Sequence, residues 1–195
     1  MSRPDVSVLV MSKRMFEDVM QRSGITDDNV ESWGDSGYYF ISINDLELDS
    51  ELDKTDFHSY FYNNHSNVLR LAFADIETEK PVIIEYKSRV KESGKTLLIV
   101  NPFTSVQAEE IFDFIDKIKR GKRPVTLIVH CHAGVSRSAA VGEFAVKYLG
   151  GDYEAFRKMH PNILPNTLVM KKLREIAEAD YIGNNYDSIG GDIMG

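Results

Sequence analysis

The chain has 195 residues, a hydrophobic fraction of 43% and a charged fraction of 27%, values typical of one soluble globular domain. Its formal net charge of −7 argues against broad electrostatic binding to nucleic acid or to an anionic membrane surface. No run approaches the ~20 apolar residues of a membrane span, and a single cysteine excludes an internal disulfide. We therefore expect a cytoplasmic protein, kept in a reducing compartment, with no nucleic-acid partner and no membrane partner.

The amino-terminal segment predicts a strand, a helix and a second strand. The β-branched run 6–10 predicts the first strand, and residues 12–22 predict a helix with Ser12 as its N-cap. Residues 38–43 predict the next strand, while residues 26–37 show no pattern that assigns them an element. Strand–helix–strand order is typical of a parallel sheet with a helical crossover. The helix is expected to turn three hydrophobic residues inward: Met15, Phe16 and Val19.

An acidic stretch and a further strand come next. Residues 45–56 carry six carboxylates and one lysine, which predicts a solvated loop. The alternative is an acidic rim beside a binding site, where it would repel polyanions. Residues 68–73 predict a strand, and this strand leads directly into the segment Ala74-Asp75-Ile76-Glu77.

A segment near 81–100 has the character of an inserted β-hairpin. Apolar and charged residues alternate along 81–91, which is the period of a strand, and a second apolar run occupies 96–100 after Gly94. A helix over 82–92, opened by Pro81, is the competing interpretation.

The carboxyl-terminal half alternates helices with one buried strand. The expected elements are a helix to Arg120 with a Thr104–Gln107 capping box, a strand over 125–129, and helices over 137–149, 153–159 and 167–180. We expect one α/β domain over 1–182, with a central, mostly parallel sheet and helices on both sides. The glycine-rich segment 183–195 is expected to be a flexible tail.

The strand 125–129 leads into a short polar loop that holds Cys131. A free thiol is mostly protonated at neutral pH and is then a modest nucleophile. The amino terminus of the following helix and successive backbone N–H groups would favour a thiolate and bind an anion. Gly134 allows backbone conformations that other residues resist. We expect the loop to hold a phosphate- or sulfate-type anion through His132, Ala133, Gly134, Val135, Ser136 and Arg137.

Two residues at the end of this loop fit the same chemistry. Arg137 carries a planar fork that can grip two phosphate oxygens at once, which a lysine cannot do. Ser138 can donate its hydroxyl to the sulfur of Cys131 and make the thiolate a better leaving group. The alternative is a structural cysteine with a surface arginine. A metal site at 130–132 is disfavoured because adjacent side chains at a strand end point to opposite sides, and no second Cys/His cluster exists.

The sequence His130-Cys131-x5-Arg137-Ser138 resembles the signature of the cysteine-dependent protein phosphatases, the protein-tyrosine and dual-specificity superfamily. The resemblance implies that Cys131 is the nucleophile, that Arg137 binds the phosphate and that Ser138 assists the thiolate. It also implies that His130 orders the loop, and that neither a metal nor another cofactor is required.

The same resemblance points to Asp75 as the general acid. In the family, a strand of the kind formed by 68–73 leads to a loop whose aspartic acid protonates the leaving oxygen. Asp75 lies 56 positions before Cys131, whereas dual-specificity members usually place this acid much closer. Leaving out the 20 residues of 81–100 reduces the separation to 36, which is near the family pattern. Asp56 is the next candidate.

The substrate implied by the resemblance is a phosphorylated protein or peptide, with phosphotyrosine favoured and phosphoserine or phosphothreonine allowed. One alternative is a phosphoinositide or inositol-phosphate phosphatase, whose loops often carry lysines where this chain has His132 and Val135. An RNA 5′-triphosphatase is a second alternative, which the acidic net charge disfavours. A non-catalytic phospho-binding module is the third, but such modules usually lack the cysteine or the arginine.

Overall fold

The computed structural model describes residues 5–45, 59–87, 95–121 and 124–190. Its strands are β1 (Val6–Ser12), β2 (Tyr38–Asn44), β3 (Val68–Ala72), β4 (Val82–Lys87), β5 (Lys95–Val100) and β6 (Val125–Cys131). Its helices are α1 (Lys13–Arg22), α2 (Val30–Asp35), α3 (Ser105–Arg120), α4 (Arg137–Leu149), α5 (Tyr153–Met159) and α6 (Thr167–Gly190). Most of the acidic stretch, 46–56, lies outside the described residues.

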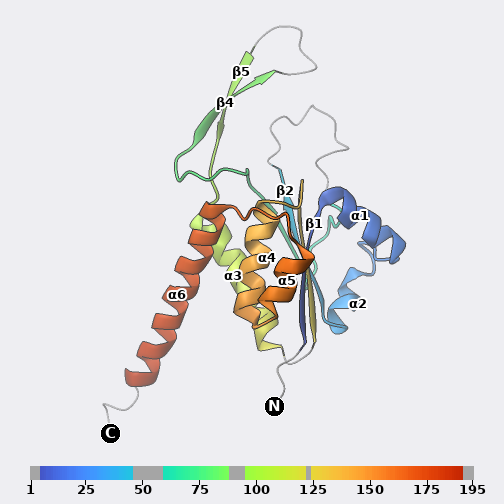
Figure 1. Ribbon diagram of the computed structural model, residues 1–195, viewed down its shortest axis with the longest axis vertical. Coiled ribbons are helices and arrows are strands. Elements are labelled where there is room, and N and C mark those ends of the chain that lie inside the picture. Colours follow the sequence, from blue (N-terminus) through green and yellow to red (C-terminus); the bar gives the residue numbers. More distant parts are fainter. Residues whose placement is uncertain (1–4, 46–58, 88–94, 122–123, 191–195) are drawn as a thin grey trace.

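Four parallel strands form the central sheet, in the order β1-β6-β2-β3 (Figure 1). Strand β6 therefore has a hydrogen-bonded neighbour on each side and lies in the interior of the sheet. Its register pairs Cys131 with Ser12 on β1 and His130 with Ser42 on β2. Ligands in open α/β sheets bind at the carboxyl ends of the strands, and this register brings three strand ends together at Cys131.

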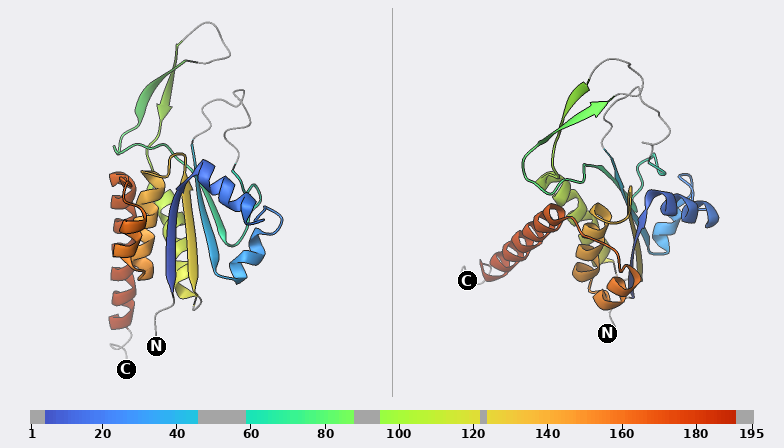
Figure 2. Two further views of the ribbon diagram at one scale, coloured as in Figure 1. Left: turned by 45° about the vertical axis from the view of Figure 1, so that its right-hand side comes forward. Right: turned by 45° about the horizontal axis from the view of Figure 1, so that its top comes forward.

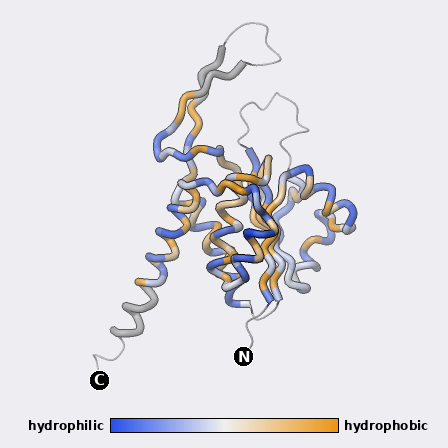
Figure 3. The backbone as a smooth tube through the Cα atoms, in the orientation of Figure 1, coloured by the Kyte–Doolittle hydropathy of each residue, from blue (hydrophilic) through white to orange (hydrophobic). Residues whose placement is uncertain are grey.

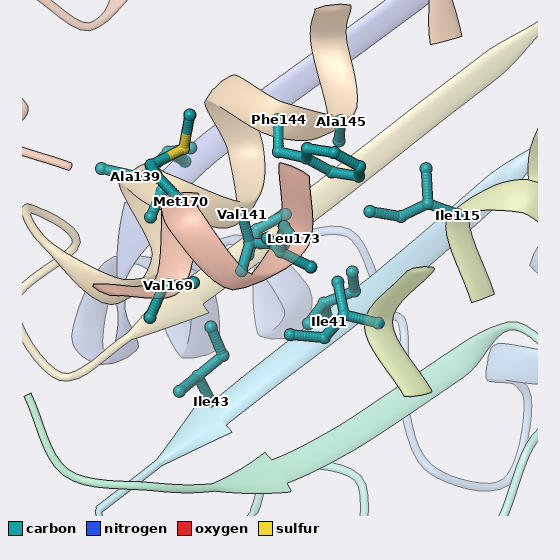
Figure 4. Close-up of a cluster of buried hydrophobic side chains, with 14 of the residues drawn as sticks. Ile41, Ile43, Ile115, Ala139, Val141, Phe144, Ala145, Val169, Met170 and Leu173 are labelled. Carbon is teal, nitrogen blue, oxygen red and sulfur yellow. The ribbon is translucent and has the colours of Figure 1, made fainter. Parts of the chain in front are cut away.

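Helices cover both faces of this sheet, which confirms the predicted α/β fold (Figure 2). Helices α3 to α6 cover one face, and Figure 4 shows side chains of β2, α3, α4 and α6 pointing toward one another there. Helices α1 and α2 cover the other face around Phe16, Phe40 and Phe61. Because β6 supplies Leu127 to the first core and Ile128 to the second, its apolar run needs no polar alternation.

Helix α1 has the expected bounds and cap but a different inward face. The Ser12 side chain accepts a hydrogen bond from the Met15 backbone N–H, as expected of an N-cap. Phe16 and Met20 are buried, four residues apart, whereas Met15 is 55% exposed, so its expected inward position is wrong. The helix turns the 16/20 stripe to the sheet, and a residue one position earlier points about 100° away from that stripe.

The predicted hairpin is present, and the alternative helix over 82–92 is wrong. Strands β4 and β5 pair antiparallel, with Ile83 opposite Ile99 and Val82 opposite Val100. The base of the hairpin is hydrophobic (Figure 3), and it extends beyond the carboxyl ends of the parallel strands (Figure 1). Pro81 is compatible with either element, but the period-two alternation favours the strand.

Helix α6 continues to Gly190, past the predicted end at residue 180 and into the segment expected as a tail. Glycine costs a helix roughly 1 kcal/mol relative to alanine, so Gly183 weakens the helix without ending it. Residues 191–195 lie outside the described residues. Among the helices of the described chain, none is both long and apolar enough to cross a membrane.

Two glycines with positive φ allow a test of how tightly the sheet is packed. Gly37 has a φ of +85°, and a Cβ there would lie 2.1 Å from the carbonyl oxygen of Pro124, while Gly24 has a φ of +66° and open space around it. We expect Gly24→Ala to lower the free energy of unfolding by about 1 kcal/mol through backbone strain alone. Gly37→Ala adds a backbone collision at the start of β2 and should cost about 3 kcal/mol or more. Denaturant unfolding of both variants checks this, and equal losses would contradict the packing argument.

Candidate active site

Strand β6 delivers Cys131 to the carboxyl edge of the sheet, where it is 2% exposed. The sulfur lies 3.1 Å from the Ser138 hydroxyl oxygen, on the first turn of α4. The backbone N–H of Gly134 also donates to the sulfur, at 3.3 Å. Two donors aimed at one sulfur stabilise a negative charge on it, and the amino terminus of α4 adds its partial positive charge.

The backbone of residues 131–137, here the Cys131 loop, curls with its carbonyl groups outward. The carbonyls of His132, Val135 and Ser136 accept hydrogen bonds from the backbone N–H groups of Lys13, Leu164 and Asn166 respectively. A peptide unit is planar, and its C=O and N–H point in opposite directions. The N–H groups of Ala133, Ser136 and Arg137 therefore point away from these anchors, which suits an anion-binding concavity.

Gly134 is required by this curl for two reasons. Its φ is +74°, a region that glycine enters without strain. A Cβ at this position would lie 2.4 Å from the backbone nitrogen of Ser12 and 2.5 Å from the backbone carbonyl carbon of Met11. The loop thus packs directly on the backbone at the β1–α1 junction.

The guanidinium of Arg137 is buried and tied to the ends of two neighbouring strands. Its Nη1 donates to the carbonyl oxygen of Phe73 at 2.8 Å and to that of Asn44 at 3.4 Å. Its Nη2 lies 2.6 Å from Asp45 Oδ1. Its Nε is buried and has no hydrogen-bond partner among the described residues. An arginine has five N–H donors, so the Nε–H and one Nη2–H remain after these three acceptors are served.

Asp45 is a site residue that the sequence did not reveal. It was assigned with residues 45–56 to a solvated loop, but its carboxylate bonds Arg137 and lies 3.5 Å from His132 Nδ1. Its side chain is 43% exposed, so the acidic-rim alternative describes it better than a loop remote from the site. The available signal was its position directly after a strand, since β2 and β6 end at the same edge of the sheet.

Asp75 lies beside the Cys131 loop in spite of the inserted hairpin. It belongs to the 74–80 loop that follows β3, and its Oδ1 accepts hydrogen bonds from Ser136 Oγ at 2.6 Å and from Asn166 Nδ2 at 2.8 Å. Asn166 is fully buried, and its Oδ1 accepts a hydrogen bond from the Val169 backbone N–H at 3.0 Å, as expected of a helix N-cap. The hydrogen bond from Asn166 Nδ2 to Asp75 is visible only in the tertiary structure, because Asn166 and Asp75 are 91 positions apart in the sequence.

His130 lies beneath the loop as a buried, neutral residue. Its Nε2 lies 2.6 Å from the Ser42 hydroxyl, and its ring stacks on Phe16 at a centroid distance of 4.2 Å. Burial lowers the pKa of His130 to about 3, and the positive charge of Lys13 acts in the same direction. A neutral imidazole can exchange a hydrogen bond with Ser42 and so ties β6 to β2 just before Cys131.

The remaining residues of the loop differ in their exposure to solvent. His132, Ala133 and Val135 are exposed, and Gly134 and Ser136 are half-buried. Within the described part of the chain, no group of three or more His, Cys, Asp or Glu side chains is arranged to hold a metal ion.

The chain is similar in fold to several solved protein structures. The human tyrosine phosphatase-like serine/threonine/tyrosine-interacting protein shares 22% identity and has a TM-score of 0.43, with 88% of this chain and 87% of that chain covered. Tk-PTP in its active form shares 14% sequence identity and has a TM-score of 0.39, with 90% of this chain and 92% of that chain covered. PTPMT1 in complex with PI(5)P shares 16% sequence identity and has a TM-score of 0.42, with 89% of this chain and 91% of that chain covered.

No family model matches the chain, and no curated protein sequence matches it. Likenesses at these identities and TM-scores say nothing about substrate, so the chemistry of this chain has to follow from its own residues.

The buried His130 makes a specific prediction for acid stability. Between pH 6.5 and about 3 the unfolded chain binds a proton at this histidine that the folded chain does not. The free energy of unfolding should therefore be fully maintained above pH 6.5 and should fall, by roughly 3–5 kcal/mol from this group, as the pH drops toward 3. His130→Asn should lack this component, so that its stability deficit shrinks on acidification. Urea titrations from pH 7 to 4 measure the difference, and His132→Asn, at an exposed position, is the control. A constant deficit for His130→Asn would refute the prediction.

Proposed function

We propose that this protein is a phosphomonoester hydrolase that works through a phosphocysteine intermediate, with phosphorylated proteins or peptides as substrates. The observation that carries the proposal is the buried Nε of Arg137, which lacks a hydrogen-bond partner in the described part of the chain and belongs to the same short loop as the Cys131 sulfur. A buried donor without a partner costs free energy, and a phosphate oxygen would satisfy it. The Nε–H and the neighbouring Nη2–H share one edge of the planar guanidinium, which suits two phosphate oxygens.

In the first step the Cys131 thiolate attacks phosphorus, an S–P bond forms and the P–O bond to the leaving group breaks. The loop N–H groups and Arg137 stabilise the charge on the other phosphate oxygens as it redistributes. Asp45 and the carbonyls of Phe73 and Asn44 hold Arg137 in place, so little reorganisation is needed when substrate enters.

Asp75 is suited to supply the proton to the leaving oxygen. Its Oδ1 is occupied by the donors of Ser136 and Asn166. An oxygen that accepts two hydrogen bonds is a poor site for a proton, so the proton of the neutral acid resides on Oδ2. Protonation of the leaving oxygen completes the first step and leaves Asp75 as a carboxylate.

In the second step the same carboxylate takes a proton from water, and the water oxygen attacks the phosphocysteine. The S–P bond breaks, phosphate is released and the thiolate returns. The Ser138 hydroxyl, 3.1 Å from the sulfur, stabilises the departing thiolate. Apart from the substrate and water, the groups that act in this cycle are side chains and backbone N–H groups of the chain itself.

The charges near the loop favour a monophosphorylated group on a protein over a polyanion. Asp45 is partly exposed at the edge of the site, and the chain carries a net charge of −7. A second or third phosphate would meet this negative field, whereas a phosphotyrosine flanked by neutral or basic residues would not.

The first test compares the wild type with Cys131→Ser and Asp75→Asn on phosphotyrosine and phosphoserine peptides, inositol phosphates and triphosphorylated RNA. We expect the wild type to release phosphate from the phosphotyrosine peptide, Cys131→Ser to release none above background, and Asp75→Asn to be slower by about 10²–10⁴-fold. Release of phosphate is followed by a colorimetric assay. Preferential turnover of inositol phosphates or RNA would contradict the substrate class, and peptide capture without hydrolysis would contradict the enzymatic assignment.

The second test replaces Arg137 by lysine, which keeps the charge but removes the two-donor edge. We expect kcat/KM to fall by about 10²–10³-fold, because a single ammonium cannot hold two phosphate oxygens and also serve Phe73, Asn44 and Asp45. Arg14→Lys, at an exposed arginine on α1, is the matched control. Activity of Arg137→Lys within a few fold of the wild type would remove the bidentate role.

A further inference from the structure

We infer that Glu77 and Glu79 are positioning residues for Asp75, which together with Lys171 and the first turn of α6 hold the 74–80 loop closed against the Cys131 loop. This inference rests on the proposed function, since it concerns the step in which Asp75 delivers its proton.

Three alternate residues of the 74–80 loop contact the start of α6. Asp75 accepts from Asn166 Nδ2, Glu77 Oε1 accepts from the Thr167 backbone N–H at 3.2 Å, and Glu79 pairs with Lys171. The Ile76 carbonyl also accepts a hydrogen bond from Asn166 Nδ2, at 3.3 Å. On a helix, residues four apart lie one turn apart on one face, which describes Thr167 and Lys171. The loop therefore meets the start of α6 through contacts from Asp75 to Glu79.

The charges of these contacts are complementary. The first N–H groups of a helix have no partner within it and carry partial positive charge, and Glu77 serves one of them. The hydrogen bond and charge of Lys171 lower the pKa of Glu79, and those of Glu79 raise the pKa of Lys171. Glu79 and Lys171 are 58% and 55% exposed. Exposed pairs of this kind contribute little to overall stability and weaken with salt.

The contacts act at the two ends of a short loop. Asp75, near its start, touches Ser136 of the Cys131 loop, while Lys80, at its end, precedes the inserted hairpin at Val82. Without Glu77 and Glu79, only Asn166 and Ser136 would restrain Asp75 among the hydrogen bonds found in the described chain. Loss of the pair should therefore misplace the acid without unfolding the domain.

The experiment measures hydrolysis of a series of aryl phosphates whose leaving groups range from strongly to weakly acidic. A good leaving group departs without a proton, so only poor leaving groups need Asp75. We expect Glu77→Ala/Glu79→Ala to match the wild type within about twofold on the most activated ester and to be about 10-fold slower on unsubstituted phenyl phosphate. Asp75→Asn, which lacks the acid altogether, should show the steepest dependence of rate on the acidity of the leaving group. A merely structural defect would lower all rates equally.

The matched control is Glu109→Ala/Glu110→Ala, which removes the same charge from two exposed positions of α3 and should keep the wild-type profile. Raising sodium chloride from 0.05 to 0.5 M should steepen the wild-type profile and change that of Glu77→Ala/Glu79→Ala little. Amide hydrogen exchange of residues 74–80 should be faster in the double variant. A wild-type profile together with unchanged exchange in that variant would overturn the inference. A wild type no faster than Cys131→Ser on every ester would instead overturn the proposed function, while the exchange measurement would still judge the loop contacts.

Discussion

The buried guanidinium of Arg137 is the constraint on which the site depends. A charged group that leaves water must be paired and hydrogen-bonded, and here the partners are the carbonyls of Asn44 and Phe73 and the carboxylate of Asp45. These acceptors lie at or just past the ends of β2 and β3. The ends of both strands are therefore drawn to the loop that carries Cys131, and Asp75 follows Phe73 by only two residues. The Arg137 side chain thus helps to place the candidate acid Asp75 next to the Cys131 loop.

Hydrogen bonds to neighbouring segments also fix the loops around the Cys131 sulfur. Three carbonyls of the Cys131 loop have backbone donors in neighbouring segments, which turns the N–H groups of the same peptide units inward. Asn166 joins three parts of the site: its backbone N–H binds Ser136, its Nδ2 binds Asp75 and its Oδ1 caps α6. The long hairpin after the 74–80 loop can be tolerated because the loop is fixed before the hairpin begins.

The local elements were predictable because they depend on local chemistry. The two-sided burial of β6, the capping box of α3, the period-two pattern of β4 and the bounds of α4 and α5 all follow from the spacing of residues close in sequence. The errors have physical causes too. Met15 was placed inward because its hydrophobicity suits either side of the stripe, and α6 was ended early because glycine is only a weak helix breaker in the middle of a helix.

The sequence by itself determined the candidate nucleophile Cys131 and its candidate partners Arg137 and Ser138, because the three lie within eight consecutive residues of one loop. Only the tertiary structure decided that Asp45 joins them and that Asp75 reaches the loop in spite of the inserted hairpin. The sequence holds 30 acidic residues, among which the family resemblance singled out Asp75, whereas Asp45 was grouped with the solvated stretch 45–56. Their positions arise from strand order, since β2 lies beside β6 and β3 lies beside β2 in a parallel sheet, although both strands are far from β6 in the chain. A hydrogen bond such as that between Asp75 and Asn166, across 91 positions, has no signature in a single sequence.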